Sequence, residues 1–158
     1  MLKAYIYRLP ATDTFTHQLL QMQEEFERQG IVQDLSLGLF RSDYMVQARG
    51  TETSIRQVEF NTISCSFGAL CEQTSGMHKY LSDYGFYDGL AKKNILDMPA
   101  NPAIKNLAEG LAEAHRAYSA LSAVSASEAL EQAILFVVQS GERNAFDQRL
   151  LEYELLQT

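Results

Sequence analysis

Polar side chains gather between Val58 and Gly68, where a strand pattern runs into a helix pattern. Glu59 and Asn61 are two residues apart, so on a strand they project from the same face. One carboxylate and one amide oxygen would suit a Mg²⁺ ion that is shared with substrate phosphates. The alternative is a solvent-facing edge strand with ordinary polar residues. Spacing alone favours that plainer interpretation, because such a pair is common.

Hydroxyl groups crowd the turn that follows this strand pattern. Thr62, Ser64 and Ser66 precede a predicted helix, and the free N–H groups and dipole of a helix start favour an anion. The hydroxyls therefore indicate either an anion-binding turn or a simple helix cap, and capping is the commoner role. Cys65 lies in the same turn without a basic neighbour, so we do not expect a nucleophilic thiol there.

Two further groups of polar residues could bind a substrate. Arg41 lies among apolar residues, and it could hold a carboxylate bidentately or simply pair with Asp43 or Glu59. A second cluster follows an apolar run and opens a helix, which is where open α/β sheets place ligands. That cluster could bind a zwitterion, or it could be a charged first helical turn. Its members are Glu142, Arg143, Asn144, Asp147, Gln148 and Arg149.

Composition excludes several classes of protein. The chain has 158 residues, 46% of them hydrophobic, and a net charge of −7, so we expect a globular protein that does not bind nucleic acid. No signal peptide is apparent, and the longest apolar run, 133–138, is too short to span a bilayer. Two cysteines without metal-ligand spacing indicate reduced thiols in the cytosol. The chain has no catalytic triad pattern and no glycine-rich phosphate loop.

A predicted hairpin would position the first two groups. Residues 35–47 and 55–60 have extended patterns, and a polar turn at 50–53 joins them. An antiparallel pairing of these runs would bring Arg41–Asp43 toward Glu59 and Asn61. The fold class is therefore predicted to be mixed α/β, with helices around a β-hairpin and a buried strand.

Helical patterns flank the hairpin. The first predicted helix is capped by Thr12 or Asp13 and stops at Gly30, and its apolar stripe is predicted to pack in a core. Asn101-Pro102 is a good start for another helix. The remaining expectations are a short strand or irregular lead-in at 4–9, a helix over 66–84 that Thr74–Gly76 loosens, a turn at 84–89, a loop at 92–100, a helix to about 120, a helical turn within 122–132, a strand buried on both faces at 133–138, and a helix over 142–156.

Three ordered stretches closely resemble the signatures of eukaryotic-type glutathione synthetase. They are Leu37–Met45 (LGLFRSDYM), Val58–Gly68 (VEFNTISCSFG) and Glu142–Arg149 (ERNAFDQR), and the resemblance runs from about residue 11 to the end. It implies an ATP-grasp fold and an ATP-dependent ligase. Such an enzyme joins γ-glutamylcysteine to glycine through an acyl phosphate, in the cytoplasm and often as a homodimer.

The same resemblance assigns residues. Glu59 and Asn61 would hold Mg²⁺, and Glu59 would lie beside ATP. The substrate wall would comprise Arg41, Ile63, Ser64, Cys65, Ser66, Glu142, Arg143, Asn144 and Gln148. No side chain is assigned as a catalytic nucleophile, since positioning and charge neutralisation carry this chemistry.

Family members are much longer than this chain. Their glycine-rich lid and glycine-binding residues follow the matched region, so residues 1–158 are predicted to form one partial domain with part of the metal and substrate sites. An alternative is a non-catalytic module that binds γ-glutamylcysteine or glutathione without ATP machinery.

Overall fold

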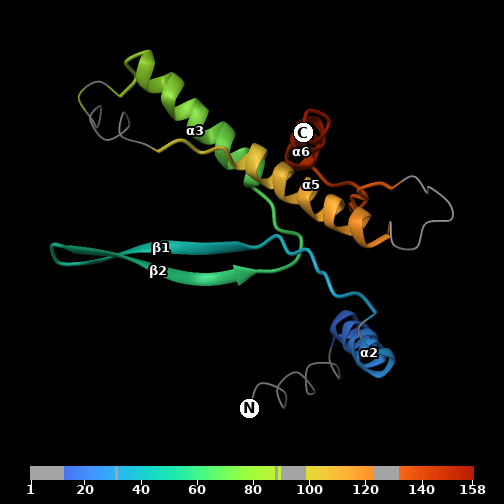
Figure 1. The fold of residues 1–158 in the computed structure, drawn as a ribbon. Helices are drawn as coiled ribbons and strands as arrows, with labels where there is room; N and C mark the ends of the chain where they lie inside the picture. The colour runs from blue at the N-terminus through green and yellow to red at the C-terminus, as the bar shows by residue number, and fades with distance from the viewer. Residues whose placement is uncertain (1–12, 31, 88, 90–98, 123–131) are drawn as a thin grey trace. The chain divides into compact units, whose positions relative to one another are not determined.

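The computed structural model describes residues 13–30, 32–87, 89, 99–122 and 132–158 (Figure 1). These residues form helices and one two-stranded antiparallel sheet, which confirms the predicted mixed α/β class. The elements, in chain order, are α2 (Thr14–Gln29), β1 (Arg41–Arg49), β2 (Glu52–Asn61), α3 (Gly68–Asp83), α5 (Ala103–Ser122) and α6 (Ala145–Leu155).

The chain divides into two compact units, 1–36 and 37–158, and α2 belongs to the first. Asp13 caps this helix by accepting hydrogen bonds from the amides of Phe15 and Thr16. Gly30 ends it with a positive φ of 83°, a conformation that costs glycine little. The predicted helix and both of its caps are therefore confirmed.

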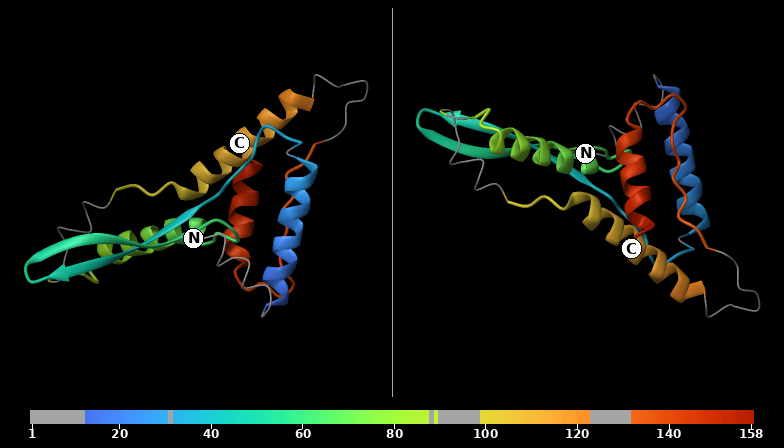
Figure 2. Two further views of the ribbon diagram at one scale, coloured as in Figure 1. Left: turned by 90° about the horizontal axis from the view of Figure 1, so that it is seen from below. Right: turned by 90° about the horizontal axis from the view of Figure 1, so that it is seen from above.

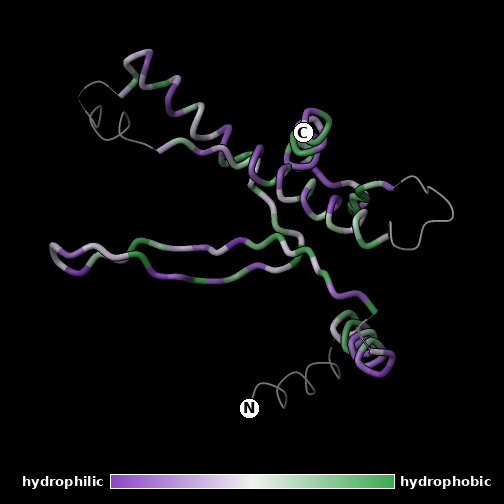
Figure 3. The backbone as a smooth tube through the Cα atoms, viewed as in Figure 1, coloured by the Kyte–Doolittle hydropathy of each residue, from purple (hydrophilic) through white to green (hydrophobic). Residues whose placement is uncertain are grey.

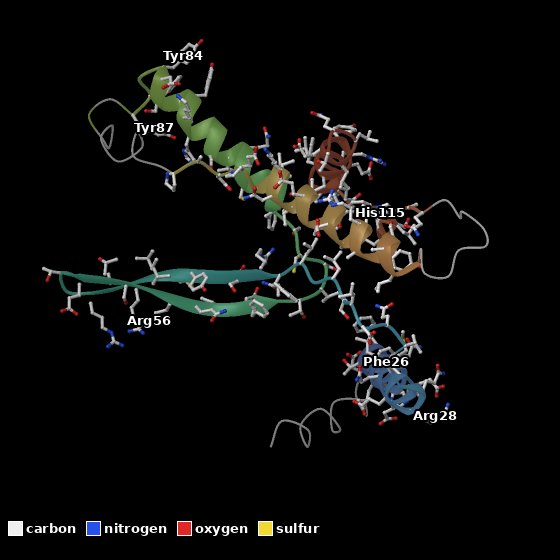
Figure 4. The ribbon with its side chains drawn as sticks, in the orientation of Figure 1. Phe26, Arg28, Arg56, Tyr84, Tyr87 and His115 are labelled. Carbon is white, nitrogen blue, oxygen red and sulfur yellow. The ribbon has the colours of Figure 1, made fainter. Side chains whose placement is uncertain are left out.

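The apolar stripe of α2 does not pack in a core. Phe15, Leu19, Met22 and Phe26 are all exposed, and hydrophobic and hydrophilic residues lie on opposite sides of the helix (Figure 3). Figure 4 labels Phe26 on this helix. The prediction of core packing is wrong for this structure, because all four of these side chains are exposed.

The predicted hairpin is present in the second unit. Strands β1 and β2 pair antiparallel along their lengths, and only Gly50 and Thr51 separate them. Gly50 has a φ of 62°, which a tight hairpin turn requires. The turn is shorter than the predicted 50–53, because Glu52 and Thr53 already pair with β1.

A β-bulge interrupts the hairpin. Asp43 lies opposite Glu59, but the next residue, Tyr44, lies opposite Gln57, so Val58 is an extra residue in β2. A bulge re-aims side chains and increases strand twist. The polar residues between the bulge and the end of β2 therefore occupy a short segment with its own register.

Three helices pack together in the second unit. α6 contacts both α3 and α5, which also contact each other (Figure 2). Among the residues that the structure describes, Ala69 of α3 and Ala108 of α5 are fully buried. Gly68 lies so close to Leu107 that an added Cβ would fall 2.4 Å from the Leu107 Cδ1. Small residues thus allow α3 and α5 to approach closely. On α5, the residues Ile104, Ala108 and Leu111 are buried.

A carboxylate from α3 supports the start of α5. Glu72 Oε2 accepts a hydrogen bond of 2.7 Å from the Ile104 amide. The predicted cap Asn101 lies just before this helix, and its Nδ2 donates to Ser75 Oγ of α3. The helix begins at Ala103, one residue later than its predicted start at Pro102.

The substitution Glu72→Ala is expected to lower the free energy of unfolding by about 1 kcal/mol, because it removes a helix cap. Urea denaturation checks this value. Glu109→Ala is the matched control, since Glu109 is an exposed residue of α5 with an ion pair of 3.8 Å to Lys105 that contributes little. Equal losses in the two variants would contradict a capping role for Glu72.

Two other helix predictions are corrected. α3 runs unbroken through Thr74–Gly76, where Thr74 Oγ1 donates to the Leu70 carbonyl and Ser75 Oγ to the Cys71 carbonyl. These bonds keep the hydroxyls on the helix surface. The last helix begins at Ala145 and not at Glu142, because Asn144 is its N-cap.

The apolar run Ala133–Val138 is not a strand in the part of the chain that the structure describes. Leu135 and Val137 are 83% and 88% exposed, whereas Ile134 and Phe136 are half-buried. The predicted strand, buried on both faces, is therefore wrong here, because no described strand pairs with the run. Only every second side chain of the run is sheltered.

Other predicted segments have different outcomes. The turn after α3 is confirmed, with positive φ at Gly85 and Gly89. The segments at 4–9, 92–98 and 123–131 lie outside the described residues. Within the described ranges, no helix has both the length and the apolar character needed to cross a membrane.

Candidate metal and substrate site

Arg41, the first residue of β1, is the centre of the polar end of the hairpin. Its Nε and Nη2 donate to the two carboxylate oxygens of Asp43 at 2.7 and 2.9 Å. Its Nη1 donates to the Ser66 carbonyl at 3.4 Å, and its guanidinium carbon lies 5.6 Å from the centre of the Phe67 ring. Arg41 therefore links the hairpin to the turn that precedes α3.

Glu59 and Asn61 lie beside Arg41, as the predicted hairpin requires. In the observed register Asn61 is opposite Arg41 and Glu59 is opposite Asp43. Glu59 Oε1 is 3.9 Å from Arg41 Nη2, and Asn61 Nδ2 donates to the Arg41 carbonyl at 3.2 Å. The predicted proximity of these two groups is confirmed.

The two carboxylates beside Arg41, those of Asp43 and Glu59, are paired with it to different extents. Hydrogen bonding to Arg41 lowers the pKa of Asp43 and raises the pKa of Arg41 further. The Glu59 side chain is 56% exposed, and its contact to Arg41 is longer, at 3.9 Å. The arrangement leaves the Glu59 carboxylate as the more accessible anion.

These groups fit a hard cation that takes some ligands from outside the chain. Asn61 uses its NH₂ group for the Arg41 carbonyl, which leaves its side-chain oxygen as the end that can face an ion beside Glu59. Among the described residues, no group of three or more His, Cys, Asp and Glu could hold a metal. Mg²⁺ tolerates such a sparse protein contribution, because it usually keeps water and phosphate oxygens as ligands.

Asp43 is a residue of this cluster that the sequence did not select. The available signal was its spacing from Arg41, since both residues project from the same face of β1. From the sequence, Asp43 was one of two alternative partners for Arg41, and the other was Glu59. The observed register adds that Asp43 also faces Glu59 across the hairpin.

The turn from Thr62 to Phe67 has an unusual backbone. Ser64 and Phe67 have positive φ values of 51° and 71°, which are uncommon for residues with a Cβ. Ile63 is 77% exposed, and the Cys65 thiol donates to the Asn61 carbonyl at 3.1 Å. Each such φ costs roughly 1–3 kcal/mol, so contacts elsewhere must hold the turn in place.

The amide groups at the start of α3 are already occupied by a carboxylate of this chain. The residue at the N-cap position is Phe67, whose side chain makes no capping hydrogen bond. Asp147 instead accepts from the amides of Phe67, Ala69 and Leu70 at 2.7, 2.9 and 3.1 Å. The expectation that Ser64 or Ser66 caps this helix is therefore wrong, and the anion at this helix start is Asp147.

The second polar cluster lies around the start of α6. Asn144 caps α6 by accepting from the Asp147 amide, and its side-chain NH₂ donates to Asp147 Oδ2. Glu142 accepts from the Asn144 amide and from the Gln139 side chain, both at 2.8 Å, and the first of these bonds is the main cause of its lowered pKa. Arg143 is exposed and Gln148 is half-buried.

Two family models together match the whole chain. Residues 1–140 match the ATP-binding domain of eukaryotic glutathione synthase, and residues 132–158 match a model described as eukaryotic glutathione synthase. The chain belongs to the eukaryotic glutathione synthase family. The resemblance carried by the three sequence motifs is thereby confirmed, and so is the fold class.

Several curated glutathione synthetases align with this chain. The relative from Dictyostelium discoideum is 36% identical over 151 residues, which is 90% of this chain and 29% of that protein. The glutathione synthetase large chain of Schizosaccharomyces pombe is 36% identical over 167 residues, which is 98% of this chain and 33% of that protein. The human glutathione synthetase is 36% identical over 145 residues, which is 91% of this chain and 28% of that protein. The chain spans about a third of the length of these relatives.

A single peptide group of this chain connects the two polar clusters. Its carbonyl, from Ser66, accepts from Arg41, and its N–H, from Phe67, donates to Asp147. Asp147 in turn contacts Asn144. The sequence-predicted residues thus form two groups joined through a residue, Asp147, that sequence placed only in the second cluster.

The ionisation of Asp147 is expected to stabilise the chain above about pH 4. Burial opposes the charge, but hydrogen bonds from Phe67, Asn144, Leu70 and Ala69 outweigh it and lower the pKa of Asp147. A lowered folded-state pKa gives stability that is present above the unfolded-state value and lost as pH falls through the folded-state value. The free energy of unfolding should therefore decline below about pH 4.

Urea unfolding of the unchanged chain and of Asp147→Asn, at a series of pH values, checks this expectation. The variant lacks the titrating group, so the stability difference between the two proteins should shrink as the solution is acidified. Asp83→Asn, at the exposed end of α3, is the control. A difference that does not change with pH would contradict the linkage to Asp147.

Proposed function

We propose that this chain supplies part of the active site of a glutathione synthase, which joins γ-glutamylcysteine to glycine with ATP. Family membership supports the proposal, and so does the convergence of Arg41, Asp43, Glu59 and Asn61 at one end of the hairpin. The match to an ATP-binding domain favours this ligase over the binding module without ATP machinery. The chain would form one partial domain of a cytoplasmic homodimer.

Glu59 and Asn61 would hold Mg²⁺, with Glu59 beside ATP. The exposed Glu59 carboxylate and the anchored Asn61 amide support this assignment. When bound, the ion would neutralise phosphate charge during acyl phosphate formation. The work of Arg41 and Asp43 would be to orient these two ligands through the hydrogen-bonded end of the hairpin.

The turn after β2 and the residues around the start of α6 would form the γ-glutamylcysteine wall. The exposed Arg143 and the half-buried Gln148 offer donors for carboxylate and amide groups of the dipeptide. Arg41 would meet a substrate carboxylate, and in doing so it would exchange part of its bond to Asp43. The full set comprises Arg41, Ile63, Ser64, Cys65, Ser66, Glu142, Arg143, Asn144 and Gln148.

Chemistry at this site would require no side-chain nucleophile. The γ-phosphoryl group of ATP would pass to the cysteinyl carboxylate, giving an acyl phosphate and ADP, and the glycine amine would then attack the acyl carbon and release phosphate. The residues of this chain would bind the dipeptide and fix the position of its cysteinyl carboxylate. Holding two reactants in attack geometry supplies a large part of such a rate enhancement.

Calorimetric titration with γ-glutamylcysteine, in the presence and absence of Mg-ATP, tests the proposal. We expect saturable binding that Mg-ATP changes, with free glutamate as a control ligand that binds far more weakly. No binding of the dipeptide under either condition would contradict the proposal. Binding that Mg-ATP leaves unchanged, without turnover, would instead support the binding module.

A further inference from the structure

We propose that Asp147 is a positioning residue that fixes the Ile63–Ser66 segment for γ-glutamylcysteine by holding the peptide group between Ser66 and Phe67. The inference rests on the proposed function of that segment. It assigns to Asp147 a role that none of the sequence motifs gave it.

The segment needs an external support. Ser64 and Phe67 both have positive φ, and such conformations persist only where surrounding contacts determine them. Neither serine hydroxyl caps the helix that follows, since Asp147 occupies its first amides. A turn of this kind would relax if the contacts at its end were lost.

Asp147 and Arg41 each form a hydrogen bond to the peptide group between Ser66 and Phe67, one at its N–H and the other at its carbonyl. The Ser66 carbonyl accepts from Arg41 Nη1 at 3.4 Å, and the Phe67 N–H donates to Asp147 Oδ2 at 2.7 Å. Rotation of this peptide plane would break both hydrogen bonds together. The Phe67 ring beneath the Arg41 guanidinium adds a third contact at the same place.

Asp147 itself has no capacity left for substrate. Only 8% of its surface is exposed, and its two oxygens accept four hydrogen bonds, from the amides of Phe67, Ala69 and Leu70 and from the Asn144 side chain. A carboxylate has about four lone-pair sites, so all of them are occupied. Asp147 therefore acts through the turn and not on the substrate.

The test compares the unchanged protein with Asp147→Asn, and Asp83→Asn is the matched control because that aspartate is exposed at the far end of α3. An asparagine presents an NH₂ group where one of the backbone N–H groups now donates. We expect the affinity for γ-glutamylcysteine to fall roughly 10- to 100-fold, as small misplacements of binding groups do. The affinity for Mg-ATP should stay within about twofold of the unchanged value, since the hydrogen bonds of the Asp147 carboxylate go to the start of α3 and to Asn144, and not to the proposed Mg²⁺ ligands.

A merely structural role would give a different pattern. If Asp147→Asn lowers the thermal midpoint but binds γ-glutamylcysteine as the unchanged protein does, the positioning role is wrong. Equal losses for γ-glutamylcysteine and Mg-ATP would also overturn it. Should the unchanged protein fail to bind the dipeptide, the proposed function would fail, and the positioning role with it.

If Asp147→Asn does not fold, a second variant, Asp147→Glu, still tests the proposal. Asp147→Glu keeps the charge and both acceptor oxygens on a longer side chain, so it should fold and recover part of the dipeptide affinity. Amide NMR signals of Phe67, Ala69 and Leu70 should move in this variant, while those of the β1–β2 turn should not. Moved signals with full dipeptide affinity would overturn the proposal.

Discussion

Glu59→Ala is expected to abolish ATP-dependent ligation in an active protein that contains this sequence, with a loss of at least about 10³-fold in rate. The reason is that Glu59 is the accessible carboxylate of the hairpin cluster, whereas Asp43 is engaged by Arg41. Removing Glu59 would leave the proposed Mg²⁺ site with one amide oxygen. The measurement is the rate of glutathione formation over a range of Mg²⁺ concentrations.

The fold should tolerate this change. Glu59 is more than half exposed, and its 3.9 Å contact to Arg41 is a surface ion pair of small energetic value. Glu52→Ala, at the other end of β2, is the matched control and should leave the rate unchanged. Retained activity of Glu59→Ala, with a normal Mg²⁺ dependence, would remove Glu59 from the site.

Arg41→Ala is expected to raise KM for γ-glutamylcysteine roughly 10- to 100-fold, since a hydrogen bond to a charged group contributes about 1.5–3 kcal/mol. The effect on KM for ATP should be small. Arg41→Lys keeps the charge but loses the planar fork, so it should recover only part of the affinity. Steady-state kinetics with each substrate varied in turn measures both constants.

Arg49→Ala, at the turn end of β1, is the matched control for the loss of an arginine from this strand. It should leave both KM values unchanged. An effect of Arg41→Ala that is confined to ATP would contradict the assigned substrate role. A loss for γ-glutamylcysteine in both variants would point to hairpin stability as the cause.

Local sequence signals predicted the elements that depend on neighbouring residues. Extended patterns on either side of a polar turn indicated the hairpin, and the proximity of Arg41–Asp43 to Glu59 and Asn61 followed from it, whereas the register itself comes from the structure. Asp13 and Gly30 indicated the ends of α2 because caps act within one helical turn. These features needed no knowledge of the rest of the chain.

Features that depend on distant partners were not predictable in the same way. The cap of α3 comes from Asp147, 78 residues after Ala69, and no local pattern announces such a donor–acceptor pair. The apolar run at 133–138 indicated burial, but hydrophobicity cannot say whether a neighbouring strand lies alongside. The α2 stripe was misjudged for the same reason, since amphipathicity does not identify the surface that covers it.

Because Phe67 and Asp147 are far apart in the sequence, the hairpin can form during synthesis before the hydrogen bond between these two residues. Hairpins form within about 1–10 μs, so β1 and β2 can pair while the remainder of the chain is still being made. The amide of Phe67 has to wait for Asp147, which is translated 80 residues later and closes a long loop. The proposed metal ligands would therefore be in place on the nascent chain before the dipeptide wall is complete.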